Sequence, residues 1–252
     1  MAAPELRVIG LGGLPEVRPG DDIAALILEA AERQGIRLRR TGDVLVVTQK
    51  IVSKAEERVV ALADVEPGPE AARLAQETEK DPRVVELILR ESRRIVRQAG
   101  PVLITETRHG FVCANAGVDA SNVGQGLVTL LPEDPDRSAG EIRAGLREGA
   151  GLEVAVVISD TFGRPGREGH TNGAGGIAGM EAFVDYVGRM DPYGYELRVS
   201  TLAVADELAG AAELVMGKLS GVPAAIVRGY AYPKGSGTAR DMIRPAERDL
   251  FR

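Results

Sequence analysis

Residues 154–160 have the sequence VAVVISD, and the run 154–159 is the clearest buried strand in the chain. A short apolar run rich in β-branched residues is typical of a strand that is covered on both faces. Asp160 follows this strand directly, between the small polar residues Ser159 and Thr161. The segment therefore predicts a core strand that ends in an acidic side chain.

Strands and helices alternate on either side of this segment. A second buried strand, residues 44–47, leads directly into Thr48, Gln49 and Lys50. Other strands are predicted at residues 6–11, 102–107, 111–114, 197–203 and 224–227. Those at 102–107 and 111–114 form a hairpin that turns at His109 and Gly110. Helices are predicted after Asp21 or Asp22, after Asp81, near Ser138 and over residues 206–216. This mixture indicates a mixed α/β (α+β) fold class.

Two further stretches of the sequence are a helix start and a glycine-rich segment. Asp81-Pro82 is a helix start, because an acidic cap precedes a proline where no amide hydrogen is needed. This helix is predicted to bury Val85, Leu89 and Ile95 and to expose Arg90, Arg93, Arg94 and Arg97. The glycine-rich segment 163–179 predicts no element. Because no repeat or long linker divides the chain, residues 1–252 are expected to form one unit.

The composition is that of a globular enzyme. Of the 252 residues, 44% are hydrophobic and 27% are charged, which is enough for a proper core. The net charge of −6 offers no overall positive field for DNA or RNA. Neither a membrane helix nor a signal peptide is expected. The single cysteine, Cys113, fits a reducing compartment, so the predicted location is the cytoplasm.

A second acidic loop has the same form as the one at Asp160. Asp119 lies in the sequence NAGVDASN, residues 115–122, which follows a predicted strand and supplies amide and hydroxyl groups. Such loops suit Mg²⁺ or Mn²⁺, which often bridge protein carboxylates to substrate phosphates. The alternative is that each aspartate only orders its own loop by accepting bonds from nearby amides. The residues alone leave both interpretations open.

Lys50 and Lys54 follow the strand at 44–47, four residues apart. They are placed either to neutralise nucleotide phosphates or to lie on the solvated edge of a helix or turn. Standard phosphate-binding fingerprints are absent, since Met216-Gly217-Lys218-Leu219 is not a P-loop and residues 173–179 miss the dinucleotide pattern by one position. His109, His170 and Cys113 lack a zinc spacing, and no G-x-S-x-G elbow supports a Ser-His-Asp triad.

Together these segments resemble the coenzyme F-420 glutamate ligases, which add glutamate to the lactyl-phosphate tail of a deazaflavin coenzyme. The matching stretches run the whole length of the chain in order and spacing: residues 13–15, 19–22, 42–56, 115–123, 160–164, 193–194, 196–197, 205–207 and 227–229. Such a series is far more specific than any single motif.

The resemblance implies a GTP-dependent enzyme of mixed α/β fold, with two closely associated lobes and an intertwined homodimer. A divalent metal, Mg²⁺ or Mn²⁺, would be held by Asp119, Asp160 and Thr161. GTP would contact Leu14, Pro15, Glu16, Val17, Gln49, Lys50, Lys54, Asn122, Met216, Gly217, Lys218, Leu219, Ser220, Gly221 and Val222. The other partners would be L-glutamate and the deazaflavin coenzyme precursor.

Three departures from the family pattern affect these expectations. Some relatives have an acidic metal ligand where this chain has Lys218, in a loop one residue shorter, so a second metal ion is either absent or held by other groups. Residues 170–175 begin with His170 in place of the usual glutamine and have glycines after Asn172, which bears on substrate choice. The extra C-terminal flavin-binding domain of some relatives is not expected here.

The implied reaction passes the γ-phosphoryl group of GTP to the lactyl carboxylate, and the glutamate amine then displaces phosphate from the acyl phosphate. Arg164 or Arg167 would hold an acidic substrate. No general base is identified: Glu168, Asp206 and Glu207 are candidates, each with a solvated or helix-capping alternative. Two other functions remain open, a ligase for another carboxylate and a module that binds metal and nucleotide without catalysis.

Overall fold

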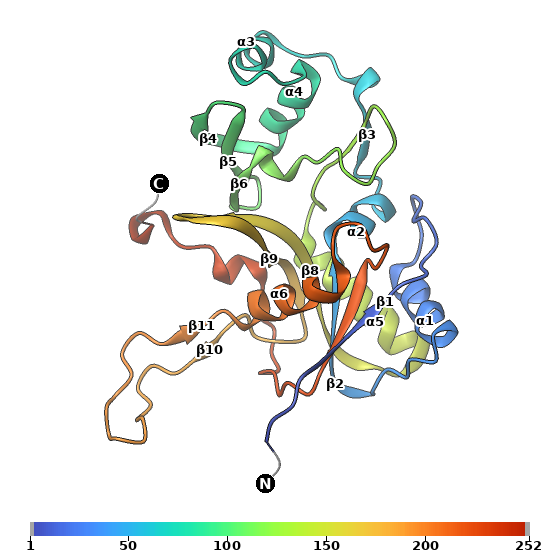
Figure 1. Cartoon of the computed structure of the whole chain (residues 1–252), viewed down its shortest axis with the longest axis vertical. Helices are drawn as coiled ribbons and strands as arrows, with labels where there is room; N and C mark the ends of the chain where they lie inside the picture. Colours follow the sequence, from blue (N-terminus) through green and yellow to red (C-terminus); the bar gives the residue numbers. More distant parts are fainter. Residues whose placement is uncertain (1–2, 250–252) are drawn as a thin grey trace.

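The computed structural model of the chain describes residues 3–249 and is built around a five-stranded sheet. The strand order is β1–β12–β2–β8–β9, formed by Arg7–Leu11, Ala224–Arg228, Thr41–Thr48, Glu153–Arg164 and Arg167–Ala178. β2 and β8 are parallel, and the other neighbouring pairs are antiparallel. The two buried strands predicted from the sequence are therefore direct neighbours inside the sheet (Figure 1).

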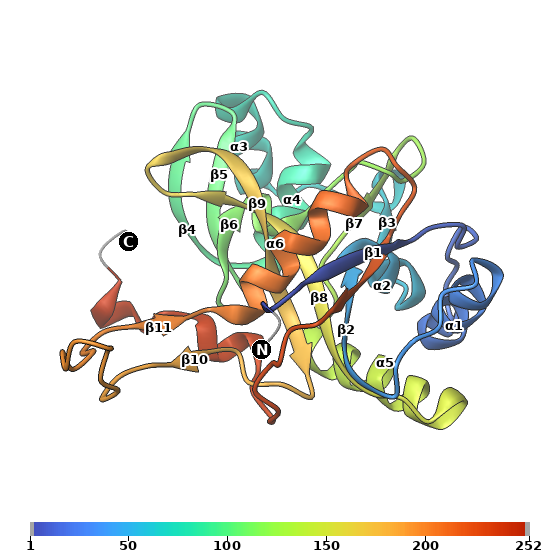
Figure 2. The same cartoon turned by 60° about the horizontal axis from the view of Figure 1, so that its bottom comes forward.

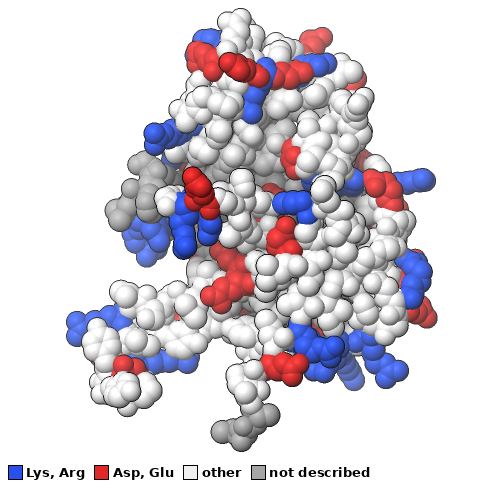
Figure 3. Space-filling view, viewed as in Figure 1, with Lys and Arg blue, Asp and Glu red and all other residues white. Residues whose placement is uncertain are grey.

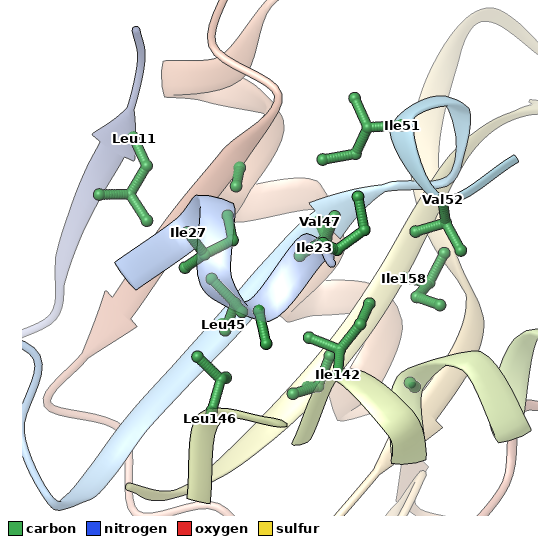
Figure 4. Packing of buried hydrophobic residues seen from close by; sticks show 14 of the residues in the cluster. Leu11, Ile23, Ile27, Leu45, Val47, Ile51, Val52, Ile142, Leu146 and Ile158 are labelled. Carbon is green, nitrogen blue, oxygen red and sulfur yellow. The ribbon is translucent and has the colours of Figure 1, made fainter. Parts of the chain in front are cut away.

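Helices cover both faces of this sheet, because successive residues of its central strands point to opposite sides and both sides are apolar. Leu45 and Val47 of β2 belong to one core cluster, and Val44 and Val46 belong to the other. The first cluster is covered by α1 (Ile23–Arg33), α2 (Gln49–Ala55) and α5 (Pro135–Ala150). Figure 4 shows their side chains meeting those of β2 and β8. The second cluster is covered by α6 (Val204–Met216).

A smaller part of the chain between α2 and α5 has an apolar cluster of its own, around Leu74, Ile88 and Leu103. It lies at the top of Figure 1. Its elements are β3 (Val59–Ala61), η1 (Leu62–Asp64), α3 (Pro69–Thr78), α4 (Pro82–Glu91), β4 (Ser92–Ala99), β5 (Val102–Thr107), β6 (Val112–Ala114), η2 (Asn115–Gly117) and β7 (Leu127–Thr129). Phe111 contacts Phe162 of β8, with ring centroids 6.0 Å apart. The predicted mixed α/β class is confirmed.

An arm extends from the body between β9 and α6. Its base is a short ladder of β10 (Val184–Asp185) and β11 (Thr201–Leu202). Figures 1 and 2 show that the chain between these two strands reaches well beyond the rest of the protein. The C-terminal segment contains η3 (Ala239–Met242) and η4 (Ala246–Arg248).

The helix predicted after Asp81 is shorter than expected. Asp81 caps it as predicted, but α4 ends at Glu91, and Ile95 lies in β4. The backbone becomes extended at Ser92, and the following residues pair with β5, Ile95 opposite Thr105. The prediction that Ile95 and the arginines after residue 91 are helical is wrong, because strand pairing with β5 outweighs the local helical pattern.

The strand that contains Asp160 is longer than predicted. β8 continues to Arg164 and forms a hairpin with β9, which is the glycine-rich segment that predicted no element. Glycine allows this segment to lie directly under α5, because a Cβ atom on Gly176 would be 2.2 Å from the carbonyl oxygen of Pro135. Asp160 therefore lies where the buried part of β8 gives way to its partly exposed part.

Two further boundaries differ from the prediction. The strand expected at 197–203 is reduced to β11 (Thr201–Leu202), and the Thr201 amide bonds locally to the Val199 carbonyl. The helix expected near Ser138 begins at Pro135, because Asp134 caps it as Asp81 caps α4. The β5–β6 hairpin, the strands at 6–11 and 224–227, and the helices after Asp22 and over 206–216 are confirmed to within two residues.

Among residues 3–249, no helix combines the length and the apolar composition that crossing a membrane requires. The predicted cytoplasmic location stays a prediction. The single unit predicted over 1–252 includes residues 1–2 and 250–252, which lie outside the described part of the chain.

Candidate functional site

A cleft of about 750 Å³ lies where the central sheet meets the smaller part of the chain. This volume is typical of sites for nucleotides and other small ligands. Almost all site residues predicted from the sequence line it, although they come from five separate segments. They are Leu14, Pro15, Glu16, Val17, Lys50, Lys54, Asp119, Asn122, Asp160, Thr161, Met216, Gly217, Lys218, Leu219, Gly221 and Val222. Gln49 and Ser220 do not line the cleft.

The register of two strands explains why these segments meet. β2 and β8 are parallel, and Thr48 at the end of β2 lies opposite Ser159. The residues that follow, Gln49 and Lys50 on α2 and Asp160 on β8, therefore lie near one another at this edge of the sheet. Ligand sites in α/β proteins form at this edge, beyond the carboxyl ends of parallel strands.

Asp119 is held at the cleft by Lys50 and by its own loop. The Lys50 Nζ atom donates to the Asp119 Oδ2 atom at 2.6 Å and to the Ser121 hydroxyl at 2.8 Å. The Ser121 hydroxyl and amide also donate to the two Asp119 carboxylate oxygens, at 2.7 and 2.8 Å. Burial opposes ionisation of Asp119, but these donors outweigh it and lower its pKa. The carboxylate is thus charged and fixed in position.

Asp160 has a different electrostatic setting. Burial raises the pKa of the Asp160 carboxyl to about 6, and the nearby Asp119 carboxylate adds to the rise. The Thr161 amide and the charges of Lys218 and Lys50 act in the opposite direction. Two carboxyl groups close enough to affect one another, with a lysine beside each, form a site that favours cations.

A chain of hydrogen bonds runs along the side of the cleft next to Asp160. The Lys218 ammonium donates to the Thr161 hydroxyl oxygen. The Thr161 hydroxyl donates to the Asn172 Oδ1 atom at 2.9 Å, and the Asn172 amide donates to the Glu213 Oε2 atom at 2.9 Å. The chain therefore connects the loop after α6 to β8, β9 and the end of α6.

Asn172 and Glu213 line the cleft but were not predicted as site residues. Their meeting depends on α6 packing along β9. Asp206 and Glu213 are two helical turns apart, and they bond to Ala174 and Asn172, which are two residues apart on β9. The seven-residue spacing of Asp206 and Glu213 puts both on one face of the helix. This spacing is the feature of the sequence from which a polar contact of that face could have been predicted.

Three other predicted contacts are found in specific roles. Lys54 binds Glu16 at 2.5 Å and so ties the segment 14–17 to α2. The Gln49 side chain is buried and accepts a bond from the Ser53 hydroxyl at 2.7 Å. The Ser220 hydroxyl donates to the Met216 carbonyl and stabilises the loop after α6.

The donor atoms at Asp119 and Asp160 fit a hard divalent cation. They are all carboxylate oxygens, and a divalent cation there would compete with the Lys50 ammonium group for Asp119. Within the described chain, no group of three or more His, Cys, Asp or Glu residues is placed to hold a metal. A metal at this cleft would therefore complete its shell with phosphate oxygens and water, as Mg²⁺ commonly does.

The remaining candidates lie elsewhere or have structural roles. Arg164 bonds to the Glu168 carbonyl at 2.6 Å on the tip of the β8–β9 hairpin, outside the cleft lining. Asp206 accepts a bond from the Ala174 amide at 2.8 Å and so joins α6 to β9. His109 contacts two backbone carbonyls, as expected of a hairpin residue. Burial raises the pKa of the Cys113 thiol to about 12, so this thiol stays protonated.

Comparison with known proteins identifies close relatives. A family model described as F420-0:Gamma-glutamyl ligase matches residues 12–229. The chain is 49% identical over 250 residues to a coenzyme F420:L-glutamate ligase of Methanothermobacter thermautotrophicus, covering 98% of this chain and 99% of the relative. It is 49% identical over 254 residues to the enzyme of that name from Methanopyrus kandleri, covering 99% and 98%. It is 45% identical over 212 residues to that from Methanocaldococcus jannaschii, covering 84% and 85%.

Proposed function

The chain belongs to the F420-0:gamma-glutamyl ligase family, and we propose that it joins L-glutamate to the lactyl-phosphate tail of the deazaflavin precursor F420-0. It is therefore a ligase that forms a C–N bond between a carboxylate and an amine. The observation that carries the proposal is the meeting of Asp119, Asp160, Lys50 and Lys218 in one cleft. This set of charges suits the transfer of a phosphoryl group.

The proposed reaction begins with activation of the acceptor carboxylate by GTP. A carboxylate oxygen attacks the γ-phosphorus, the bond to the β-phosphate oxygen breaks, and GDP leaves. The amine of glutamate then attacks the acyl carbon and expels phosphate, with loss of a proton from the amine. Lys50 in the first turn of α2 and Lys54 in its last turn would offset phosphate charge. Most catalysis of such transfers comes from positioning and charge.

The proposed metal is Mg²⁺ or Mn²⁺, held by Asp119 and Asp160. Bound there, it would supply positive charge at the transferred phosphate oxygens. If Thr161 joined these ligands, the metal ion would share its hydroxyl oxygen with the Lys218 ammonium group or displace that group. The nucleotide is proposed to lie between residues 14–17, α2 and the loop 216–222, because these segments line the same cleft.

The test is mass spectrometry of the deazaflavin after incubation with glutamate, GTP and Mn²⁺ or Mg²⁺. The expected result is a gain of one or more glutamyl units that depends on both GTP and metal, and the mass also counts the units added. The variant D160N tests the role of Asp160, since it keeps the shape of the side chain and removes its charge. Near-normal turnover by D160N would contradict the assignment of Asp160.

The two alternatives give different outcomes in this experiment. A ligase for another carboxylate would release phosphate from GTP only when a different acceptor is supplied. A binding module would be stabilised against heat by GTP but would release no phosphate with any acceptor. Product formation with F420-0 excludes both.

We also propose that the protein is a homodimer formed through the arm. Half of the exposed large apolar side chains among the described residues lie there: Val187, Met190, Tyr193, Tyr195, Val199 and Leu202. In Figure 3 this arm, at the lower left, shows uncharged surface interrupted by a few basic groups and an acidic group. Apolar patches of this kind mark interaction sites, and a second copy of the chain is the proposed partner.

A further inference from the structure

Lys218 is an exposed residue of the loop after α6, but its ammonium group points back into the cleft. The Nζ atom donates to the hydroxyl oxygen of Thr161, and its charge also acts on Asp160. The lysine thus places a positive charge at the cleft in addition to that of Lys50, which binds Asp119.

The bonds of Thr161 fix what its hydroxyl group can do. Its hydrogen is donated to the Asn172 Oδ1 atom at 2.9 Å, and the Asn172 amide is committed to Glu213 at 2.9 Å. The hydroxyl oxygen can therefore act only as an acceptor, and Lys218 takes that role. Lys218 uses one of the two lone pairs of this oxygen, so a cation that used the other one as a ligand would lie directly against the ammonium group, and either the lysine or the cation would have to give way.

The two sides of the cleft are consequently unequal. Asp119 and Asp160 offer carboxylate oxygens to a metal, and Asp119 is already charged. The Thr161 side offers a neutral hydroxyl that is occupied by a permanent ammonium group. A second divalent ion there would meet the charge of Lys218 at close range, and among the described residues the Thr161 hydroxyl is bonded to Lys218 and Asn172 and to no carboxylate.

We propose that Lys218 is the built-in cation on the Thr161 side of the cleft, so that this protein binds one divalent ion with its nucleotide, at Asp119 and Asp160, and not two. The proposal rests on the proposed function for the metal and the nucleotide. Lys218 then acts as a specificity-determining residue for metal number, and a fixed ammonium replaces an exchangeable ion.

The test counts Mn²⁺ bound per chain in the presence of a saturating, non-hydrolysable β,γ-imido analogue of GTP. Free Mn²⁺ is measured by electron paramagnetic resonance after equilibrium dialysis. Wild type is expected to bind one ion, and K218R, which keeps the positive charge, is also expected to bind one. K218E removes the ammonium and supplies a carboxylate next to Thr161, so it is expected to bind two.

K234E is the matched control, because Lys234 is an exposed lysine outside this cleft and the charge change is the same. It is expected to bind one ion. Two ions bound by wild type or K218R would overturn the proposal, and so would a single ion bound by folded K218E. If no variant bound Mn²⁺, the proposed metal site itself would be overturned. The mass-spectrometric assay tests the proposed function separately, because it shows whether product forms and whether its formation requires metal.

A second variant makes the test independent of how K218E folds. T161V removes the hydroxyl group but keeps the side-chain shape, and Thr161 is not a metal ligand under this proposal. The Mn²⁺ dissociation constant of T161V should stay within about threefold of wild type. Loss of a metal ligand would raise it further, since a tenfold change corresponds to about 1.4 kcal/mol of binding free energy. A tenfold or greater loss of Mn²⁺ affinity would overturn the proposal.

Discussion

Asn172 is the residue on which one wall of the cleft depends. It is buried, and its side chain links the Thr161 hydroxyl on β8 to the Glu213 carboxylate on α6. N172A should lower the free energy of unfolding by about 1–3 kcal/mol, because it leaves both partners without their bond in a partly buried place. Urea denaturation at neutral pH measures this loss.

The control for N172A is the neighbouring position on the same strand. Thr171 is exposed, so T171A should change the unfolding free energy by no more than about 0.5 kcal/mol. Equal losses for the two variants would mean that the strand, and not the Asn172 bonds, is what the substitution disturbs.

The same residues show which parts of the site the sequence could predict. Apolar runs in the sequence predict the strands that precede Asp119, Asp160, Lys50 and Lys54. These four residues could therefore be predicted as site residues without knowing how the elements pack. Asn172 and Glu213 were not predicted as site residues, since they meet only when α6 packs on β9. A contact between elements that are distant in sequence is reflected in the sequence only as a spacing of residues on one element. That spacing does not identify the residue that it contacts on the other element.

Between elements, a buried polar link in the sheet is the pair of Arg228 on β12 and Asp43 on β2. Two guanidinium nitrogens donate to the two Asp43 oxygens at 2.8 and 2.7 Å, and the Asp43 side chain is 1% exposed. R228M leaves this carboxylate buried without its guanidinium partner, with the Arg39 amide still donating to it at 2.8 Å. A loss of about 3–5 kcal/mol in unfolding free energy is expected, measured by urea denaturation.

Two further variants separate the lost pair from the lost side chain. The double variant D43L/R228M should recover much of the stability, because no unpaired charge remains. R137M breaks an exposed pair with Glu141 on α5 and should cost less than about 1 kcal/mol. A similar loss for R137M and R228M would contradict the role assigned to burial.

The start of α5 is joined to β9 and η3 by a single carboxylate oxygen. The Asp136 Oδ1 atom accepts from the Ile177 amide at 2.9 Å and from the Ala239 amide at 2.8 Å, and burial raises the pKa of Asp136 above its usual value. The folded protein therefore holds this proton more tightly than the unfolded chain, and the associated stability is lost as pH rises through the folded pKa.

D136N keeps the accepting oxygen and removes the charge. Wild type should lose this stability as pH rises from about 4 towards 7, and D136N should not. D136N should accordingly become more stable relative to wild type over this range, whatever the difference between the two at pH 4. Urea titrations of both proteins at several pH values measure the difference. A difference that is constant over this range, or that moves the other way, would contradict the raised pKa.

Element boundaries were predictable where caps mark them and not where partners decide them. Asp22 and Asp81 start α1 and α4 as predicted, since a capping side chain acts within its own turn. The end of α4 and the existence of β9 depend on pairing with β5 and β8. The glycines of β9 weaken any local strand signal, although close approach to α5 requires one of them at Gly176.

At the scale of the whole molecule, the cleft lies between two parts with separate cores. The sheet with its two helix layers supplies Lys50, Asp160 and Lys218, and the smaller part supplies Asp119. The Lys50–Asp119 bond therefore links the two parts across the site. A ligand that binds both sides of the cleft would hold the parts together in the same way and would raise the thermal stability.

The arm provides the last prediction, which concerns assembly. Wild type should have twice the mass of one 26.7 kDa chain by light scattering after size-exclusion chromatography. The triple variant M190S/Y193S/V199S changes side chains that are 66%, 95% and 90% exposed, so the fold of each chain should be unaffected. If a second copy covers these residues, the variant should raise the dimer dissociation constant by about 100-fold or more, because burying each apolar side chain contributes about 1–2 kcal/mol.

The control for the arm is L214S, which changes a highly exposed apolar residue on α6. It should leave the mass and the dissociation constant unchanged, and circular dichroism should show the same fold for all three proteins. A wild-type chain that is monomeric at every concentration would contradict the proposed homodimer. A triple variant that dimerises as tightly as wild type would place the interface elsewhere, because the arm would then lose half of its exposed apolar surface without any effect on assembly.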